Sequence, residues 1–196
     1  MVGKNLREVI LERLLEEHEL GKIIEFGCGT GYYTKAIARR ASHVLATDLS
    51  DEMLEIAHIG LRGLHNVTLQ KVDCENSLFP AERFDTVFMA NVIHTIENPS
   101  KALHESHRIL KEQGLLLIIT YTDYGLTWFE KMELSLRYLM TFGIPPTYGL
   151  KNFSPEELND LIADAGFIVE EVQILGDKPR ALYLKGRKQQ TMEPLE

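Results

Sequence analysis

Short apolar runs alternate with amphipathic stretches along most of this chain. An apolar run bounded by turn residues indicates a buried strand, whereas apolar positions three or four residues apart indicate a helix with one buried face. Strands are predicted over residues 22–26, 43–47, 67–71, 83–89 and 114–120, and helices over residues 4–19, 31–41, 51–62 and 99–111. Such alternation predicts an α/β fold, in which helices cover both faces of a mostly parallel sheet.

Residues 121–152 interrupt this alternation with many aromatic side chains, and their middle part, Trp128 to Met140, is predicted to be an amphipathic helix. The segment follows the carboxyl end of a strongly apolar strand, and ligands bind at that edge of open α/β sheets. We therefore predict a helical lid over a substrate site, with a helix that only packs against the domain as the alternative. After it we predict a helix from Ser154 to about Gly166 and a hairpin of strands over residues 167–175 and 180–187.

The length of 196 residues suits one domain with a substantial core, which we place at residues 1–188, followed by a disordered polar tail at residues 189–196. No apolar run has the length of a membrane span, and the first residues do not resemble a signal peptide. The formal net charge of -8 argues against a nucleic-acid-binding surface, which would need a basic stripe. The two cysteines, Cys28 and Cys74, form no C-x-x-C pair, so a cytoplasmic location is expected. The oligomeric state is not indicated.

Three glycines at alternate positions, Gly27, Gly29 and Gly31, follow the first predicted strand and lead into a helix. A loop with so few side chains lets a ligand touch the backbone, and a helix start offers N–H groups to an anionic group. Asp48 follows the second predicted strand, where a carboxylate can accept hydrogen bonds from both hydroxyls of a ribose. The loop and the acid together predict a cofactor that contains a nucleoside.

The spacing of the loop argues against a dinucleotide. The dinucleotide fingerprint G-x-G-x-x-G has a small third glycine that lets helix and strand pack closely, but Tyr32 stands at that place here. Glu25, two residues before the first glycine, adds a negative charge. That charge disfavours a pyrophosphate and favours a ligand that carries an ammonium and a sulfonium.

With these residues the chain resembles the class I S-adenosylmethionine-dependent methyltransferases, in their type-11 domain group. The resemblance runs from about Ile23 to Ile119, and the glycine loop is its most specific motif. It implies a Rossmann-like sheet with the strand order 3-2-1-4-5-7-6 and an antiparallel last strand. It also implies S-adenosyl-L-methionine as the cofactor and S-adenosyl-L-homocysteine as the product.

The resemblance assigns roles to residues around this cofactor. The loop, which comprises Gly27, Cys28, Gly29, Thr30 and Gly31, would approach the methionine moiety. Glu25 would hold the ammonium, and Asp48 the ribose hydroxyls. Further contacts would come from Leu49 and Met53 over the adenine, Asp73 and the Cys74 backbone at its amino group, and Asn91 at the methionine end.

Several of these residues also have simpler structural interpretations. Asp48 could cap a helix, Met53 could belong to the core, and Asp73 could be an ordinary loop acid. Cys28 and Cys74 suit small buried fillers better than nucleophiles.

His94 follows the strand predicted over residues 83–89 and should reach the rim of the site. An ordinary histidine pKa suits a base for a hydroxyl or amine substrate, but a residue at this place could instead shape the pocket. His104 and His107 lie one helical turn apart without a carboxylate partner of zinc-binding geometry, so no metal is expected.

Methyl transfer from a sulfonium is an in-line displacement, for which alignment and exclusion of water matter more than a fixed triad. The lid offers aromatic candidates for the walls of an apolar acceptor site: Tyr121, Tyr124, Trp128, Phe129 and Tyr148. We therefore predict methyl transfer to a small-molecule acceptor. Two alternatives stay open: a binding or scaffolding protein of the same fold that holds the cofactor or its product without turnover, and a nicotinamide-dependent oxidoreductase.

Overall fold

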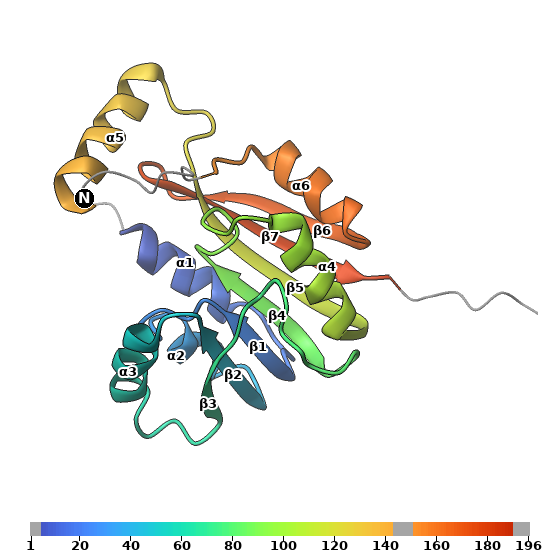
Figure 1. Cartoon of the computed structure of the whole chain (residues 1–196). Helices are drawn as coiled ribbons and strands as arrows, with labels where there is room; N and C mark the ends of the chain where they lie inside the picture. The colour runs from blue at the N-terminus through green and yellow to red at the C-terminus, as the bar shows by residue number, and fades with distance from the viewer. Residues whose placement is uncertain (1–4, 143–150, 190–196) are drawn as a thin grey trace, which may run out of the picture.

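The computed structural model describes residues 5–142 and 151–189. Its helices are α1 (Leu6–Leu15), α2 (Thr34–Ile37), α3 (Asp51–Gly60), α4 (Pro99–Ile109), α5 (Trp128–Phe142) and α6 (Pro155–Asp164). Its strands are β1 (Lys22–Phe26), β2 (His43–Asp48), β3 (Val67–Lys71), β4 (Phe84–Ala90), β5 (Leu110–Thr122), β6 (Phe167–Leu175) and β7 (Arg180–Lys188). Figure 1 shows a central sheet with helices on both sides.

All the strands belong to one sheet, whose order is β3-β2-β1-β4-β5-β7-β6. Strands β1 to β5 pair in parallel, and β7 lies antiparallel between β5 and β6. The predicted strand order and the final hairpin are therefore confirmed. Because β1 to β5 are parallel, their carboxyl ends meet at one edge of the sheet, and the residues that follow them are brought together there.

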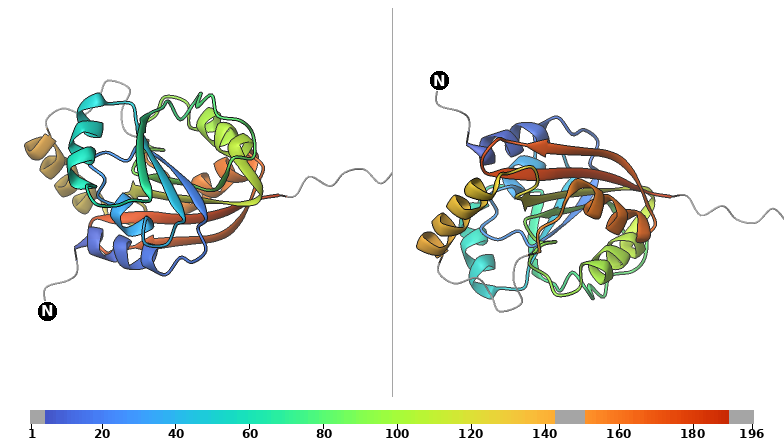
Figure 2. Two further views of the ribbon diagram at one scale, coloured as in Figure 1. Left: turned by 90° about the horizontal axis from the view of Figure 1, so that it is seen from below. Right: turned by 90° about the horizontal axis from the view of Figure 1, so that it is seen from above.

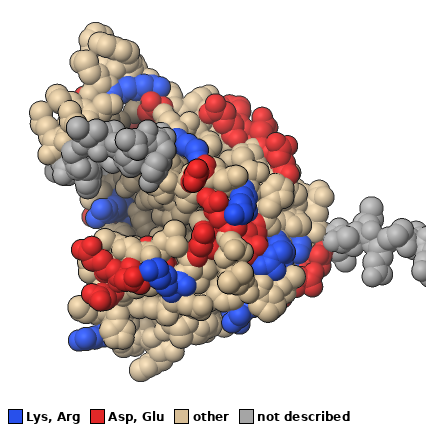
Figure 3. Space-filling view, viewed as in Figure 1, with Lys and Arg blue, Asp and Glu red and all other residues tan. Residues whose placement is uncertain are grey.

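Each face of the sheet has its own helices. Helices α1, α2 and α3 cover one face, where Ile10, Ile37 and Ala57 are buried against the strands. Helices α4 and α6 cover the other face with residues such as Leu103 and Ile162. Figure 2 shows the two layers, with α5 set to one side of them. In the space-filling view of Figure 3 the surface is hollowed between the part that carries α5 and the part that carries α3.

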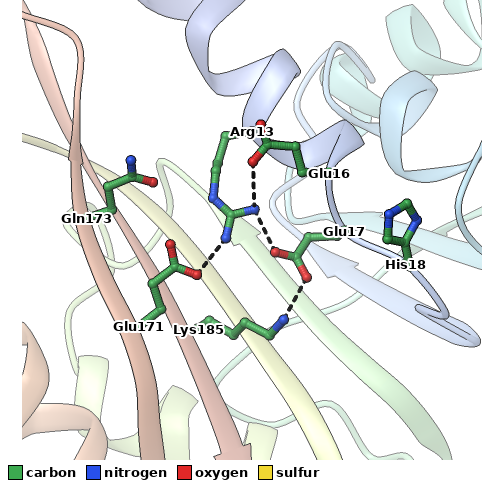
Figure 4. Close-up of a pocket in the computed structure, with 7 residues that line it drawn as sticks. All are labelled: Arg13, Glu16, Glu17, His18, Glu171, Gln173 and Lys185. Carbon is green, nitrogen blue, oxygen red and sulfur yellow. Dashed lines mark hydrogen bonds and ion pairs between the residues drawn. The ribbon is translucent and has the colours of Figure 1, made fainter.

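A polar network fastens the end of α1 and the residues after it to β6 and β7 (Figure 4). Arg13 donates to Glu17 at 2.7 Å and to Glu171 at 2.6 Å, while Glu17 accepts from Lys185 at 2.9 Å and from the Tyr183 hydroxyl at 2.6 Å. Burial alone would raise the pKa of Glu17, but these hydrogen bonds outweigh it and hold the pKa below its ordinary value. A depression of about 510 Å³ lies over the network. Its charged groups are paired with one another, so we interpret the network as an anchor for α1.

The helix predicted over residues 31–41 is much shorter in the structure, because α2 spans only Thr34–Ile37. Gly31 has a φ of +78°, and its N–H donates to the Cys28 carbonyl at 2.9 Å, so the loop makes a turn before the helix begins. Beyond α2 the backbone hydrogen bonds span three residues, and the chain leaves in tight turns. The apolar spacing of this stretch does not separate such turns from a continuous helix.

The other predicted elements are present, with bounds that differ by a few residues. Of the predicted lid, residues 143–150 lie outside the described part of the chain, and so do residues 190–196 of the predicted tail. Within residues 5–142 and 151–189, no helix is long and apolar enough to cross a membrane.

Candidate cofactor site at the strand ends

The glycine loop follows β1 directly and is held against the tip of β2. The Gly29 N–H donates to Asp48 Oδ2 at 2.8 Å, and the Cys28 N–H donates to the Thr47 carbonyl at 2.8 Å. The other oxygen of Asp48, Oδ1, accepts from the Ser50 N–H at 2.9 Å. The loop and the acid, which are far apart in the sequence, therefore meet because neighbouring parallel strands end side by side.

Gly27 and Gly29 both adopt left-handed backbone conformations, with φ values of +68° and +52°, but their surroundings differ. A Cβ atom on Gly27 would lie 2.2 Å from Val92 Cγ2, whereas a Cβ atom on Gly29 would meet nothing within 4 Å. The packing of the fold thus requires a glycine at position 27. Gly29 instead borders open space, where a ligand can reach the bare backbone.

Glu25 is buried at the end of β1 and has no cationic partner among the described residues. Its carboxylate accepts a hydrogen bond from Thr34 Oγ1 at 2.6 Å. Burial raises the pKa of Glu25 to about 7, and the negative charge of Asp48 adds to the rise, although the Thr34 hydrogen bond opposes it. A buried carboxylate without a counter-charge is costly to ionise, so this position favours a cationic group on a ligand.

Asn91 presents another unsatisfied group at the end of β4. Its φ is +59°, and its N–H donates to the Ile119 carbonyl at 2.7 Å. Its side-chain Oδ1 is buried without a hydrogen-bond partner, which holds for no other buried side-chain nitrogen or oxygen in the described ranges. Such strained backbone and orphaned acceptors cluster at binding sites. Val92, the next residue, reaches Gly27, so Asn91 lies beside the glycine loop.

The other predicted cofactor residues lie along the same edge and differ in exposure. Thr30 and Leu49 are exposed, and Met53 is half-buried in the first turn of α3. Asp73 is exposed, and its Oδ1 accepts from the Glu75 N–H at 2.8 Å. These side chains are accessible to a ligand, as the predicted roles require.

Both cysteines are buried beside this edge. Burial raises the pKa of the Cys28 thiol and of the Cys74 thiol to about 12 in each case. Because a thiol of that pKa is uncharged at neutral pH, neither is poised as a nucleophile.

His94 follows β4 at the carboxyl edge of the sheet, and its ring is largely buried. Its Nδ1 is 2.9 Å from Thr120 Oγ1 on β5, and its ring meets the Tyr121 ring edge-to-face with centroids 6.2 Å apart. Burial lowers the pKa of His94 to about 4, so the imidazole is neutral at pH 7.

The predicted lid leaves the sheet and returns to it at one place, and we call residues 123–152 the arm. Thr122 Oγ1 donates to the Phe153 carbonyl at 2.7 Å, and the Asp123 N–H donates to Asn152 Oδ1 at 3.1 Å. The Lys151 N–H donates to the His94 carbonyl at 3.0 Å. The arm is therefore attached to the sheet directly beside His94.

Helix α5 of the arm exposes many apolar side chains. They recur at three- and four-residue spacing, which places them on one side of the helix. They are Trp128, Phe129, Met132, Leu136, Leu139 and Met140. Of the predicted acceptor-site residues, Tyr121 contacts His94, whereas Tyr124, Trp128 and Phe129 are exposed. Tyr148 lies outside the described residues.

Two threonines that complete this site were not predicted. Thr34 holds the carboxylate of Glu25, and Thr120 holds the imidazole of His94. Their positions in the sequence could have indicated them, because Thr34 follows the glycine loop and Thr120 comes near the end of an apolar strand.

The helix α4 histidines have other partners. His104 Nδ1 is 2.8 Å from the Ser100 carbonyl, and the His107 ring meets the Phe167 ring edge-to-face. In the part of the chain that the structure describes, no three His, Cys, Asp or Glu side chains are grouped so that they could hold a metal ion.

Comparisons with known proteins agree with this architecture. A family model described as a methyltransferase domain matches residues 24–118. The chain is 31% identical to a demethylmenaquinone methyltransferase of Clavibacter sepedonicus, over 52% of this chain and 41% of that protein. It is 22% identical to a malonyl-[acyl-carrier protein] O-methyltransferase of Paenibacillus sp. (strain JDR-2), over 85% of this chain and 64% of that protein. It thus spans less than two thirds of the length of these curated relatives.

A solved structure from Thermotoga maritima has the same fold. That protein, a SAM-dependent methyltransferase described as a possible histamine N-methyltransferase, is 26% identical to this chain. The match covers 94% of this chain and 89% of that protein, with a TM-score of 0.69. The matched domain, the strand order and the glycine loop at the end of β1 all indicate the same fold. The described chain therefore has the fold of the class I S-adenosylmethionine-dependent methyltransferases, and its residues 24–118 match a methyltransferase domain.

Proposed function

We propose that the protein transfers the methyl group of S-adenosylmethionine to a small-molecule acceptor held between the strand ends and the arm. The observation that carries this proposal is the pair of carboxylates at the tips of β1 and β2, Glu25 and Asp48, which have no cationic partner among the described residues. An ammonium and a sulfonium are cations and suit such a site. The pyrophosphate of a dinucleotide would add charge of the same sign.

Each group at the strand ends has a matching part of this cofactor. Glu25 and the orphaned Oδ1 of Asn91 would accept hydrogen bonds from the ammonium, and the open space at Gly29 would admit the methionine chain. Asp48 would hold the ribose hydroxyls. The adenine would lie against Leu49 and Met53, with its amino group at Asp73 and the Cys74 backbone.

When bound, the cofactor supplies a methyl group on a positively charged sulfur that is open to in-line displacement. The protein then has to align the acceptor and exclude water. Tyr121 beside His94 and the exposed apolar side of α5 suit an acceptor with an apolar body. The relatives named above, which act on demethylmenaquinone and on malonyl-[acyl-carrier protein], suggest acceptors of this kind for testing.

Titration calorimetry with S-adenosylhomocysteine and with NADH tests the cofactor. We expect saturable binding of the thioether nucleoside and none of NADH, and the reverse result would establish the oxidoreductase alternative. Transfer of label from methyl-labelled cofactor to a demethylated quinone or to a malonyl thioester then tests turnover. Tight cofactor binding without transfer to any acceptor would favour the silent binding protein.

The variant Asp48→Ala is expected to weaken binding of S-adenosylhomocysteine by roughly 10- to 100-fold, because it removes charge-assisted hydrogen bonds to the ribose. It also frees the Gly29 N–H, which Asp48 now holds at 2.8 Å. Asp51→Ala is a matched control, since Asp51 begins α3 close by and pairs with Lys71 on the surface. Calorimetry should find the control unchanged, and an equal loss in both variants would contradict the assigned ribose contact.

A further inference from the structure

His94 and Thr120 form a pair at the end of the site where the arm is rooted. Thr120 is completely buried, and among the described residues its hydroxyl has one partner, His94 Nδ1 at 2.9 Å. The second ring nitrogen of His94, Nε2, has no hydrogen-bond partner within the same ranges. In the part of the chain that the structure describes, Asn91 Oδ1 is the one side-chain nitrogen or oxygen that is both buried and without a partner, so Nε2 of His94 is not buried. The Nε2 atom therefore retains accessible surface, where a bound molecule can reach it.

The position of the imidazole proton follows from counting donors and acceptors. A neutral histidine has one N–H donor and one acceptor nitrogen, and a threonine hydroxyl has a single proton to donate. If Nδ1 carried the proton and donated to Thr120, the buried Thr120 proton would be left without an acceptor, a loss of about 1–3 kcal/mol. If Thr120 donates to Nδ1, both groups are satisfied and the imidazole proton resides on Nε2.

The neighbours of the ring leave this arrangement undisturbed. The Tyr121 ring and the imidazole form an edge-to-face pair, and the Lys151 backbone N–H donates to the His94 carbonyl and not to a ring nitrogen. The Lys151 ammonium donates to the carbonyls of Ile96 and Glu97. The low pKa that burial gives His94 keeps the ring neutral at pH 7.

We propose that Thr120 is a positioning residue that fixes His94 in the Nε2–H tautomer, so that His94 donates a hydrogen bond to an oxygen of the methyl acceptor. The identity of the bound molecule rests on the proposed function, whereas the tautomer does not. A nitrogen that already carries its proton accepts no other at neutral pH, so this assignment replaces the predicted role of general base. The acceptor is then a molecule with an oxygen lone pair beside its reacting atom, such as a carbonyl, phenolate or enolate.

Nitrogen-15 NMR of the full chain tests the tautomer without substrate. The chain has seven histidines, and the His94 signals are identified by their loss in His94→Gln. We expect a protonated Nε2 and an unprotonated Nδ1 at both pH 6 and pH 8. A proton on Nδ1, or a titration of the ring near its ordinary pKa, would overturn the proposal.

Variants separate positioning from a general structural role. Thr120→Ser keeps the hydroxyl, so the His94 ring should stay in the single Nε2–H tautomer. Thr120→Val removes the hydroxyl, so the ring should become a mixture of both tautomers. The affinity for the cofactor should stay within about twofold in both variants. Should the valine variant fail to fold, the spectra of the wild type and of Thr120→Ser still decide the question.

With an acceptor in hand, His94→Gln and His94→Phe give a second test. Glutamine can still donate from the place of Nε2 but cannot act as a base, so we expect it to retain at least a tenth of kcat while phenylalanine loses more than 100-fold. Equal loss in both variants, or a wild-type rate that depends on one group near pH 6.5, would contradict the donor role. A failure of cofactor binding in the wild type would instead refute the proposed function and leave the tautomer result standing.

Discussion

Gly29→Ala is expected to lower affinity for S-adenosylhomocysteine by more than about 100-fold, equivalent to roughly 2.7 kcal/mol, without loss of the fold. An alanine methyl group at this place meets nothing within 4 Å, so it fits the ligand-free protein. It would nevertheless occupy the space through which a ligand reaches the loop backbone. The left-handed φ of +52° costs an alanine about 1–2 kcal/mol of folding free energy. Calorimetry measures the affinity, and thermal unfolding measures the cost.

Two other glycines provide controls for this experiment. Gly63 also has a left-handed φ, +88°, and open space where an alanine methyl group would lie, but it is located between α3 and β3 and is not part of the glycine loop. Gly63→Ala should therefore show a similar loss of stability and unchanged affinity. Gly27→Ala, whose methyl group would lie 2.2 Å from Val92, should lose considerably more stability than either. Equal affinities of the Gly29 and Gly63 variants would show that the ligand does not lie against this loop.

Glu25→Gln should make the ligand-free protein more stable and at the same time weaken cofactor binding. The pKa of Glu25 rises from 4.5 to about 7 on folding, chiefly because the carboxyl is buried. Between these values the unfolded chain binds fewer protons than the folded one, so the free energy of unfolding falls as the pH rises through this window. Above pH 7 the buried carboxylate is ionised, and its full cost to the free energy of unfolding is present. Glutamine carries no charge and should recover on the order of 3 kcal/mol of this free energy.

The binding effect of Glu25→Gln has the opposite sign. Loss of a charged partner for the ammonium is expected to weaken binding of S-adenosylhomocysteine by roughly 10- to 100-fold at pH 8. Denaturant unfolding at pH 8 and at pH 4 provides the internal control, since at pH 4 the carboxyl is protonated in the folded state and mostly protonated in the unfolded state, so the gain in stability should nearly vanish. A variant that is less stable than the wild type at pH 8 would show that Glu25 is already paired in the free protein.

The sequence predicted those parts of the site that follow from the order of the strands. Asp48 and the glycine loop could be placed together because parallel neighbours end at the same edge, and the structure joins them through the Gly29 N–H. The charge of Glu25 was evident, but its complete burial was not, because an acid within an apolar run can face either side of a sheet tip.

The features of the site that the sequence did not predict depend on contacts between segments that are far apart in the chain. Thr120 meets His94 across 26 residues of chain, and no periodicity indicates which side chain on one strand meets which loop residue on the next. The apolar spacing of α5 correctly predicted a helix, but spacing shows only that one side is apolar. It does not show whether protein or solvent lies over that side, and here the apolar side chains are exposed.

The backbone of the arm joins the sheet at two short stretches of chain, 122–124 and 151–153. These stretches hydrogen-bond to each other, to the residues after β4 and, through the Tyr124 carbonyl, to Arg180 of β7. On the surface, Lys178 adds an ion pair to Glu133 of α5 at 2.6 Å. None of these joints involves the glycine loop or Asp48. The described attachments of the arm are thus separate from the hydrogen bonds that hold the glycine loop on Asp48, so a change in the length or sequence of α5 should leave the geometry of that loop intact.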